Sequence, residues 1–532
     1  RYLTEHGPAL AAAPPAEVAF NYLGQFDQTV RAARRFTPSD DPTGPDTSPA
    51  AERAYLLELD VSVINGQLRM YWTYSPASLR PETVEALAER YRTLVGELAE
   101  PAVERYPLVP VQRAMLDRIR HAPRYGQYLY QWTVELREAI DPDRFQRAWA
   151  DTVRRHSALR TAIVPGAEPA QEVRPDAVPA IRWLDHSHLP KDEQERAVTE
   201  YLREVQSGGL DLGHAPVLDL AVARTGPRRA VLLATFSLLV LDVPSFGLVL
   251  DEVLARYADP ASLPRTAHPY REYVDWVAAQ DLTAAREFWR AYLSDVEQTP
   301  VLPSRPAATR PRAYTELAEW LSQEDTDALH AFARRHRVTL NAVLQCVWAR
   351  CLHERTGSAD VVFGAIVSGR PAALDDPDDR VGRFVNFLPV RLRVPSAGTF
   401  ADWVVAAQSA LFEVLRWPFL SEEQIREWCG LAPYRHLYQS LAAWEVAPLR
   451  DVLTAPHWRP AGEVTIVQDP EIPLKLTGTL FERLRLSLAY LPEDVPAATA
   501  TALFGRAVAL LVDIARGRGL EFPIDNQEEW SC

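Results

Sequence analysis

Residues 235–246 place polar groups where an apolar strand meets a helix. They read Thr-Phe-Ser-Leu-Leu-Val-Leu-Asp-Val-Pro-Ser-Phe, and a helical run follows from Phe246 to Leu254. General base catalysis at neutral pH needs a group that titrates near pH 7. The hydroxyl of Ser237 titrates far above that pH, and Leu238 beside it has no lone pair. Asp242 is the charged residue of the segment. The arrangement of strand, aspartate and helix is typical of a site, but the segment contains no histidine.

Outside this segment, residues of catalytic or metal-binding type are scattered. Cys346 and Cys351 point in different directions on a helical pattern, and we interpret both as packing residues. His186 and His188 flank a turn, but no third ligand is near them in the sequence, so no metal site is predicted. A Gly-rich phosphate loop, a Ser-His-Asp order and a Cys-His pair are not apparent in the sequence.

Composition and charge exclude several functions. The 532 residues carry a net charge of −14, which argues against sequence-independent binding to nucleic acid or to an anionic membrane. The longest apolar run, Ala230 to Val240, is shorter than the roughly 18 residues of a membrane span and suits a buried strand. Four cysteines fit a cytosolic, reducing context. The first residues, Arg1 to His6, have neither an initiator Met nor a signal-peptide pattern, so we expect a segment of a longer polypeptide.

Residues 1–100 predict a small and incomplete α+β piece. Alternating apolar residues from Leu57 to Tyr74, with Asn65-Gly66 between them, predict a β-hairpin. A helical repeat of apolar residues begins after Pro81. One hairpin and one long helix cannot bury their apolar faces alone. We therefore expect this piece to be the end of a larger domain.

The remainder predicts an α/β fold in two halves of similar size. Strands and helices alternate through residues 105–295 and again through residues 312–520, with a Pro-rich linker at 300–312. Such alternation is typical of sheets covered by helices. We assign the predicted strand Val464 to Val467 to the second half.

A series of segments in these halves resembles the condensation-domain family of nonribosomal peptide synthetases. At the third segment that family carries His-His-x-x-x-Asp-Gly-x-Ser, and the two histidine positions are Ser237 and Leu238 here. Each segment alone is a weak signal, but their order makes the resemblance specific. The segments are Tyr106-Pro107-Leu108-Val109-Pro110-Val111-Gln112, Arg155-His156-Ser157-Ala158-Leu159-Arg160-Thr161, Ser237 to Ser245, Tyr270 to Trp276, Ser368-Gly369-Arg370-Pro371, and Val381-Gly382-Arg383-Phe384-Val385-Asn386 followed by Arg391.

The resemblance implies a V-shaped pseudo-dimer of two chloramphenicol-acetyltransferase-like lobes with a tunnel between them. It also implies peptidyl carrier proteins as partners, which deliver thioesters on phosphopantetheine arms, and no cofactor bound by the domain itself. In the family the acceptor amine attacks the donor thioester, and the second histidine lies beside that amine as a base or a positioning group. Because this position is Leu238 in the chain, the resemblance implies an amide-forming domain with a degenerate site.

The family pattern assigns roles to the other motif residues. Asp242 is mainly structural in the family and pairs with an arginine, for which Arg391 is one candidate here. Val243 replaces a glycine, so its branched side chain should narrow the tunnel. Ser245 has the residue type and position of a helix N-cap. Asn386 matches a residue near the tunnel, and the expected framework residues are Arg155, His156, Arg160 and Arg391.

Two further resemblances concern neighbouring families. Residues 237–245 approach the heterocyclization signature Asp-x-x-x-x-Asp-x-x-Ser and lack only its first aspartate, but no cyclising signature follows. The segments Phe20 to Asp27 and Arg1-Tyr2-Leu3 look like the closing part of an epimerization domain. The catalytic residues of that sister group would lie upstream, so no epimerase chemistry is assigned to residues 1–100. This order implies a D-configured donor for the domain that follows.

Three functions are compatible with these patterns. The first is a condensation enzyme that works through the proximity of tethered reactants, or with a histidine from elsewhere in the chain, such as His156 or His436. The second is a non-catalytic platform that recruits a tailoring enzyme or a carrier protein. The third is a decayed domain that is kept for packing.

Overall fold

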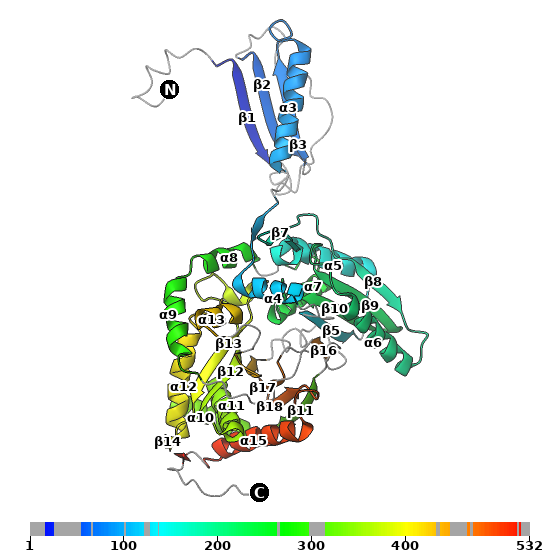
Figure 1. Cartoon of the computed structure of the whole chain (residues 1–532). Coiled ribbons are helices and arrows are strands. Elements are labelled where there is room, and N and C mark those ends of the chain that lie inside the picture. The colour runs from blue at the N-terminus through cyan, green and yellow to red at the C-terminus, as the bar shows by residue number, and fades with distance from the viewer. Residues whose placement is uncertain are drawn as a thin grey trace. The chain divides into compact units, whose positions relative to one another are not determined.

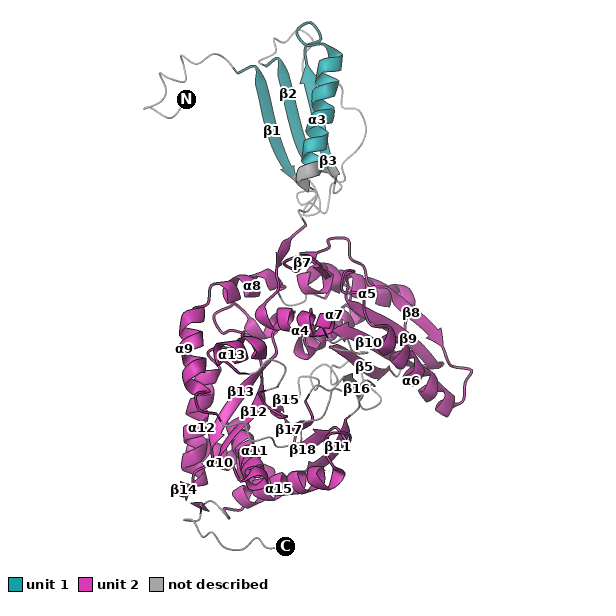
Figure 2. Cartoon of the chain, in the orientation of Figure 1, with its two compact units in different colours: residues 1–102 teal, residues 103–532 magenta. Residues whose placement is uncertain are grey.

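The computed structural model forms two compact units, residues 1–102 and residues 103–532 (Figure 2). Several predicted features lie outside the described residues. They are the Asn65-Gly66 turn, the 300–312 linker, His436 and Arg1-Tyr2-Leu3. The structure describes residues 16–25, 55–64, 67–99, 103–121, 128–136, 138–262, 266–296, 314–431, 437–446, 465–468, 472–518 and 521–522.

The first unit is a three-stranded sheet with one helix (Figure 1). Strand β1 (Val18–Gln25) runs parallel to β2 (Leu57–Ile64), and β2 pairs antiparallel with β3 (Gln67–Tyr74). Helix α3 (Pro81–Ala99) packs on β3, where Trp72 and Tyr91 meet edge to face with ring centroids 5.8 Å apart. The strands of the hairpin and the helix thus form where the alternation and the Pro81 start signal predicted them.

The sheet face of the first unit is only partly covered. Val18, Phe20 and Tyr22 alternate along β1 and are 57–58% exposed, whereas Leu57, Leu59 and Val61, their register partners on β2, are buried. A strand surface with this row of large apolar side chains is normally covered by another element.

The first half of the second unit carries two sheets. Their strand orders are β16-β5-β10-β9-β8 and β4-β7-β6. The strands are β4 (Arg105–Pro107), β5 (Leu129–Leu136), β6 (Thr161–Val164), β7 (Ala170–Val173), β8 (Ile181–Asp185), β9 (Leu218–Gly226) and β10 (Arg229–Ser237). The helices are α4 (Pro110–His121), α5 (Pro142–Arg155), α6 (Lys191–Gly208), α7 (Val243–Ala258), α8 (Tyr270–Ala278) and α9 (Leu282–Tyr292), with a 3-10 turn at Ser157–Arg160.

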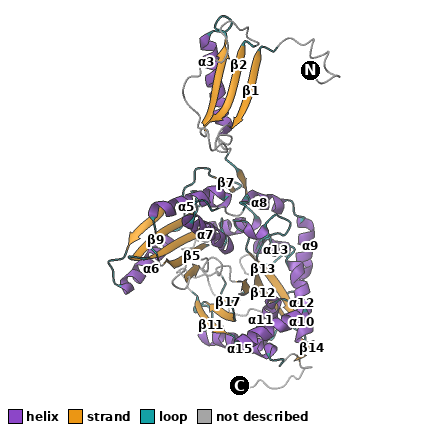
Figure 3. Ribbon diagram, turned by 180° about the vertical axis from the view of Figure 1, so that it is seen from behind, coloured by secondary structure: helices purple, strands orange, loops and turns teal. Residues whose placement is uncertain are grey.

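The larger of these sheets is covered on both faces (Figure 3). Successive side chains of a strand point to opposite faces. Leu220 and Val222 of β9 therefore enter the large core with residues of α5 and α7, whereas Ala221 packs with Leu202 of α6 on the other face. Because both faces are buried, β9 and β10 are apolar along most of their length, as the long apolar run predicted.

The second half is a six-stranded sheet with the strand order β11-β18-β17-β15-β12-β13. The strands are β11 (Thr315–Trp320), β12 (Asp360–Val367), β13 (Asn386–Arg393), β15 (Ser440–Val446), β17 (Leu474–Leu480) and β18 (Leu484–Tyr490), and β14 (Gly398–Thr399) pairs with β19 (Glu521–Phe522). The helices are α10 (Gln323–His336), α11 (Leu340–Thr356), α12 (Phe400–Val414), α13 (Glu422–Trp428) and α15 (Ala497–Ala515), with a 3-10 turn at Pro377–Asp379.

One strand departs from the predicted division. Strand β16 (Thr465–Gln468) was assigned to the second half, but it pairs antiparallel with β5 at the edge of the five-stranded sheet in the first half. The assignment was wrong because position along the chain does not determine the partner of a strand. The crossing closes an otherwise free sheet edge with a segment from the other half.

Two large cores stabilise the second unit. The first contains residues of both halves, for example Trp132 and Phe246 together with Phe384 and Phe419. The second belongs to the six-stranded sheet and its helices. Helix α15 is long and apolar enough to cross a membrane, but one of its faces is buried in this second core.

Candidate functional site

The segment that suggested a site forms a strand, a turn and a helix. Strand β10 ends at Ser237, and α7 begins at Val243, earlier than the predicted Phe246. The N-cap is Asp242, whose carboxylate accepts a hydrogen bond from the Ser245 amide at 2.9 Å. The prediction of Ser245 as the N-cap is therefore wrong. An aspartate three residues earlier occupies that role, and Pro244 fits the first turn because its missing N–H has no acceptor there.

Asp242 is fully buried and binds the loop that precedes β13. Its Oδ2 accepts hydrogen bonds from the amides of Phe384 and Val385, both at 2.9 Å, and the Arg370 guanidinium lies 3.2 and 3.3 Å from the two carboxylate oxygens. Burial opposes the charge of Asp242, but the Arg370 charge and hydrogen bonds from Ser245 and Val385 outweigh it and hold the pKa of the carboxyl below its usual range.

The predicted partner of Asp242 is wrong. Arg391 binds Asp360, with its Nε 2.8 and 3.1 Å from the two carboxylate oxygens, and it also donates to the carbonyl of Tyr292 at 2.9 Å. It lies on β13 opposite β12, so Asp360 on that neighbouring strand is within reach. Asp242 lies instead at the start of α7, where Arg370 from the loop after β12 reaches it.

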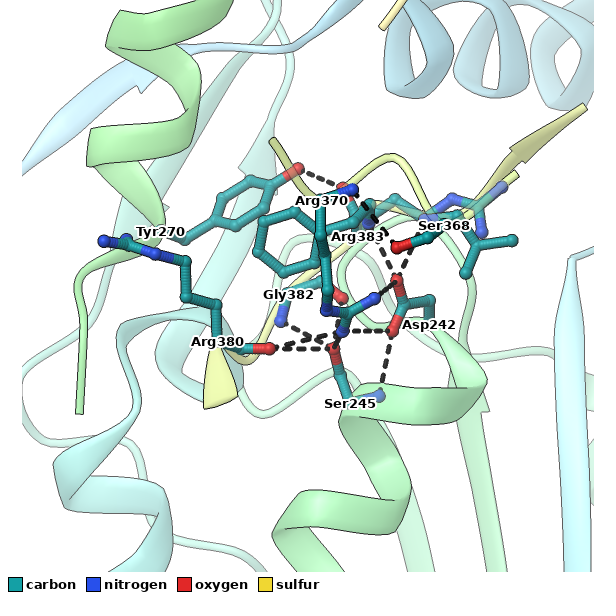
Figure 4. A network of polar contacts seen from close by, with 10 residues as sticks. Asp242, Ser245, Tyr270, Ser368, Arg370, Arg380, Gly382 and Arg383 are labelled. Atoms are coloured by element: carbon teal, nitrogen blue, oxygen red, sulfur yellow. Dashed lines mark hydrogen bonds and ion pairs between the residues drawn. The ribbon is translucent and has the colours of Figure 1, made fainter. Parts of the chain in front are cut away.

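Ser245 joins the two halves directly (Figure 4). Its hydroxyl donates to the Gly382 carbonyl at 2.9 Å and accepts from the Gly382 amide at 3.1 Å and from Arg370 at 2.8 Å. The Asp242 amide donates to the same Gly382 carbonyl at 2.9 Å. A Cβ on Gly382 would lie 2.2 Å from the Tyr270 ring, so only glycine allows this close approach.

Ser237 and Leu238 present no base at the turn. Ser237 is 1% exposed, and its hydroxyl accepts a hydrogen bond from the Leu239 amide at 3.2 Å. Leu238 is 8% exposed, belongs to the large core and donates its amide to the Tyr128 carbonyl at 2.7 Å. Gln112 fixes the turn by donating to the Leu239 carbonyl at 2.7 Å. Both positions thus serve packing and backbone geometry.

A small cavity of about 50 Å³ lies where the two halves meet. Asn386 is among the lining residues, but its side-chain amide donates to the carbonyls of Pro418 at 2.9 Å and Leu420 at 2.6 Å. Its role as a tunnel residue stays a prediction. Val243, Leu238 and Asp242 are not among the lining residues. These are Val111, Ala114, Met115, Arg118, Tyr128, Arg383, Asn386, Phe387, Ser421, Glu422, Glu423 and Tyr438.

Arg155 and His156 meet at a carboxylate away from this cavity. The Arg155 Nε lies 2.9 Å from Glu252, and the His156 Nε2 lies 2.9 Å from the other oxygen of the same carboxylate. Burial opposes the charge of Glu252, but its hydrogen bond with His156 and the nearby guanidiniums lower its pKa. The backbone carbonyl of Arg160 accepts a hydrogen bond of 2.8 Å from the Arg174 amide. Arg155 and His156 therefore hold Glu252 of α7, whereas the Nε of Arg160 has no hydrogen-bond partner, and its framework role stays a prediction.

Sequence reasoning missed three residues that shape the site. Arg370 and Arg383 are within motif segments, but a motif does not indicate which of its arginines faces which carboxylate. Tyr128 lies outside every motif. It adopts a left-handed backbone conformation with φ of 59°, which is unusual for a bulky residue, and its hydroxyl accepts a hydrogen bond from Arg118 at 3.3 Å.

Comparisons with known proteins agree with this architecture. The Condensation domain family model matches residues 102–419. A linear gramicidin synthase chain from Brevibacillus parabrevis is 31% identical over 537 residues, which is 92% of this chain but 10% of that relative. A chondramide synthase from Chondromyces crocatus is 28% identical over 536 residues, which is 85% of this chain and 14% of that relative. The chain belongs to the condensation-domain family, and it spans only a small part of the synthases that it matches.

Solved structures match the fold. The condensation domain of the monacolin K polyketide synthase MokA superimposes with a TM-score of 0.65 at 16% identity, covering 79% of this chain and 99% of that one. The X-domain from teicoplanin biosynthesis gives a TM-score of 0.65 at 21% identity, covering 80% and 98%. The predicted α/β fold of chloramphenicol-acetyltransferase-like lobes is confirmed.

Proposed function

We propose that this chain is an atypical condensation domain of a nonribosomal peptide synthetase, and that its amide-forming chemistry is impaired. Its substrates are aminoacyl or peptidyl thioesters carried on the phosphopantetheine arms of peptidyl carrier proteins. The observation that carries the proposal is the buried side chain of Leu238 at the position where the family motif has its second histidine. The surrounding framework of Asp242, Ser245 and Arg370 is intact.

Without a general base, the domain can still accelerate amide formation by holding its two substrates in place. Holding a donor thioester and an acceptor amine in contact accelerates their reaction without a base, because the cost of bringing them together is met by binding. A general base adds roughly 10²–10⁴-fold, and Leu238 cannot supply that part. We therefore expect amide formation by this domain to be slow by about that factor.

The test is amide formation between two loaded carrier proteins. The wild-type chain is compared with the variant Ser237→His/Leu238→His/Val243→Gly, which restores the family motif. We expect the variant to be faster by roughly 10²-fold or more. If the two chains react equally fast, the missing histidine does not limit the reaction, and the proposal is wrong.

A second candidate function is a non-catalytic platform for a carrier protein or a tailoring enzyme. The cavity favours this function, because a volume of about 50 Å³ is small for an acyl chain with its pantetheine arm. A platform would bind a loaded carrier in a pull-down and retain a tailoring enzyme, yet the motif-restored variant would stay inactive. Binding of neither protein would instead favour a decayed domain.

We also propose a domain assignment for the whole chain. Residues 105–295 and 312–520 are the two condensation lobes, and residues 1–100 are the tail of an epimerization-type domain. The exposed row of Val18, Phe20 and Tyr22 supports the latter, because these side chains need a cover. This order predicts that a donor carrier loaded with a D-residue reacts faster than its L-counterpart. Equal rates would contradict the assignment.

A further inference from the structure

Three buried arginines lie at the junction of the two halves, and two of them have carboxylate partners. Arg370 pairs with Asp242 at 3.2 Å. Arg380, with a side chain 3% exposed, pairs with Glu272 at 2.7 Å. In Figure 4 the Arg370 guanidinium lies beside Asp242 and Ser245, whereas the Arg380 side chain points away from them and its carbonyl faces Ser245. The carbonyl of the third arginine, Arg383, accepts the Tyr270 hydroxyl at 2.6 Å.

The side chain of Arg383 differs from the other two. The residue is 6% exposed, and its Nε has no hydrogen-bond partner. Within the part of the chain that the structure describes, no carboxylate lies within 4.0 Å of this guanidinium. Burial lowers the pKa of Arg383, and Asp242 is the carboxylate that most opposes this shift, but Asp242 is already paired with Arg370.

A guanidinium stays charged at neutral pH even when it is buried. An unpaired charge in the interior is strongly unfavourable, so a protein keeps one chiefly where a partner is supplied from outside. Arg383 lines the cavity at the junction, which is the place where such a partner would enter. The volume of about 50 Å³ exceeds the roughly 10–15 Å³ that one water needs by the same measure, so there is room for a small polar group such as a carboxylate.

The other charges of the cavity leave Arg383 available. Glu422 and Glu423 also line it, but both face Arg118, with the Glu422 carboxylate 3.5 Å from that guanidinium. The side chains of Arg118 and Glu423 are 28% and 32% exposed. The wall that they form is therefore partly exposed to solvent.

We propose that Arg383 binds the side-chain carboxylate of an acidic aminoacyl group, of the aspartate or glutamate type, that is presented as a thioester. A guanidinium binds a carboxylate through two parallel hydrogen bonds, which favours an acid over its neutral amide. Delivery of this group by a carrier protein rests on the proposed function. The carboxylate site itself does not depend on it.

The experiment compares two nearly isosteric probes, the N-acetylcysteamine thioesters of aspartate and asparagine. Calorimetry on the full chain should give an affinity for the aspartyl probe that is roughly tenfold higher or more. Arg383→Met should abolish this preference. Arg393→Met is the matched control, because it removes a surface arginine of the same half that is 74% exposed, and it should leave the preference unchanged.

Thermal unfolding separates binding from a structural role. Because Arg383→Met removes an unpaired buried charge, its Tm should equal or exceed that of the wild type. Acetate should raise the Tm of the wild type but not that of the variant. A lower Tm in both Arg383→Met and Arg383→Gln, or equal affinity of the wild type for the two thioesters, would overturn the proposal. If the motif-restored variant forms amide no faster than the wild type while the acetate effect persists, the proposed function fails and the carboxylate site stands.

Discussion

At the scale of single residues, Asp242 acts as a structural connector. Its carboxylate accepts the Ser245 amide of α7 in the first half and the amides of Phe384 and Val385 in the second half. All of these donors are directed at one buried charge, which Arg370 neutralises. The aspartate therefore holds the turn of Leu238 against the opposite half whether or not a base is present.

Replacing Asp242 by asparagine should destabilise the second unit strongly. The change leaves the Arg370 guanidinium without its counter-charge and turns an N–H group toward amide donors, which costs about 3–5 kcal/mol for a buried pair. Urea unfolding measures this free energy. Asp185→Asn, which breaks an exposed pair with Arg224, is the control and should change stability little. Equal effects of the two substitutions would show that Asp242 is not a connector.

The depressed pKa of Asp242 predicts the pH dependence of stability. A carboxyl whose pKa is lower in the folded state contributes stability that is fully present above its unfolded pKa, near 3.9, and is lost as the pH falls toward the folded value. The free energy of unfolding should therefore fall below about pH 4 in the wild type. It should fall less steeply in Asp242→Asn. Parallel profiles for the two proteins would contradict this prediction.

At the scale of elements, the turn from β10 to α7 depends on one close backbone approach. Gly382→Ala places a Cβ 2.2 Å from the Tyr270 ring, and Tyr270 is itself buried, so the ring has no room to move. We expect a loss of roughly 1–3 kcal/mol in the free energy of unfolding, the usual cost of overpacking. Gly247→Ala in α7 is the matched control, because nothing lies within 4 Å of its Cβ position.

The control should change stability in the opposite direction. Alanine is favoured over glycine inside a helix by roughly 1 kcal/mol, so Gly247→Ala should stabilise the unit slightly. Denaturant unfolding of both variants tests the pair. A Gly382→Ala protein as stable as Gly247→Ala would show that the contact between Gly382 and Tyr270 does not hold the turn.

The sequence predicted elements better than it predicted partners. Apolar runs and turn signals located β10, α7 and the hairpin strands, because these features depend on local residues. The choice of Arg391 for Asp242 failed because a motif does not show that Asp360 on the neighbouring strand binds Arg391 first. Ser245 was misassigned because the helix begins earlier, at Val243, where Asp242 accepts the amide of Ser245 itself. Long-range pairings of this kind become visible only in three dimensions.

At the scale of the whole second unit, the two halves share one core. Val367, Phe384 and Phe419 from the second half pack in the same cluster as Trp132 and Phe246 from the first. The division into lobes that the sequence suggested is therefore a division of sheets, and the apolar interior is continuous across it. The crossing of β16 into the first sheet adds a backbone link between the halves.

This shared core predicts cooperative unfolding of residues 103–532. Trp149→Ala in the first half and Phe363→Ala in the second each remove a fully buried ring and should cost about 3–5 kcal/mol. Either change should shift one and the same transition, followed by tryptophan fluorescence and by circular dichroism. Two transitions, each moved by only one of the substitutions, would show that the lobes are independent.

The central claim is that the chain lacks a proton acceptor at Leu238, and a pH–rate profile tests it most directly. Single-turnover amide formation is measured between pH 5.5 and 8.5 with carrier-loaded substrates, for the wild type and for Leu238→His. The account predicts a slow wild type and a faster variant that gains a rising limb near pH 6.5, the usual pKa of an imidazole. A wild-type chain that already reacts as fast as the variant, with the same rising limb, would contradict it.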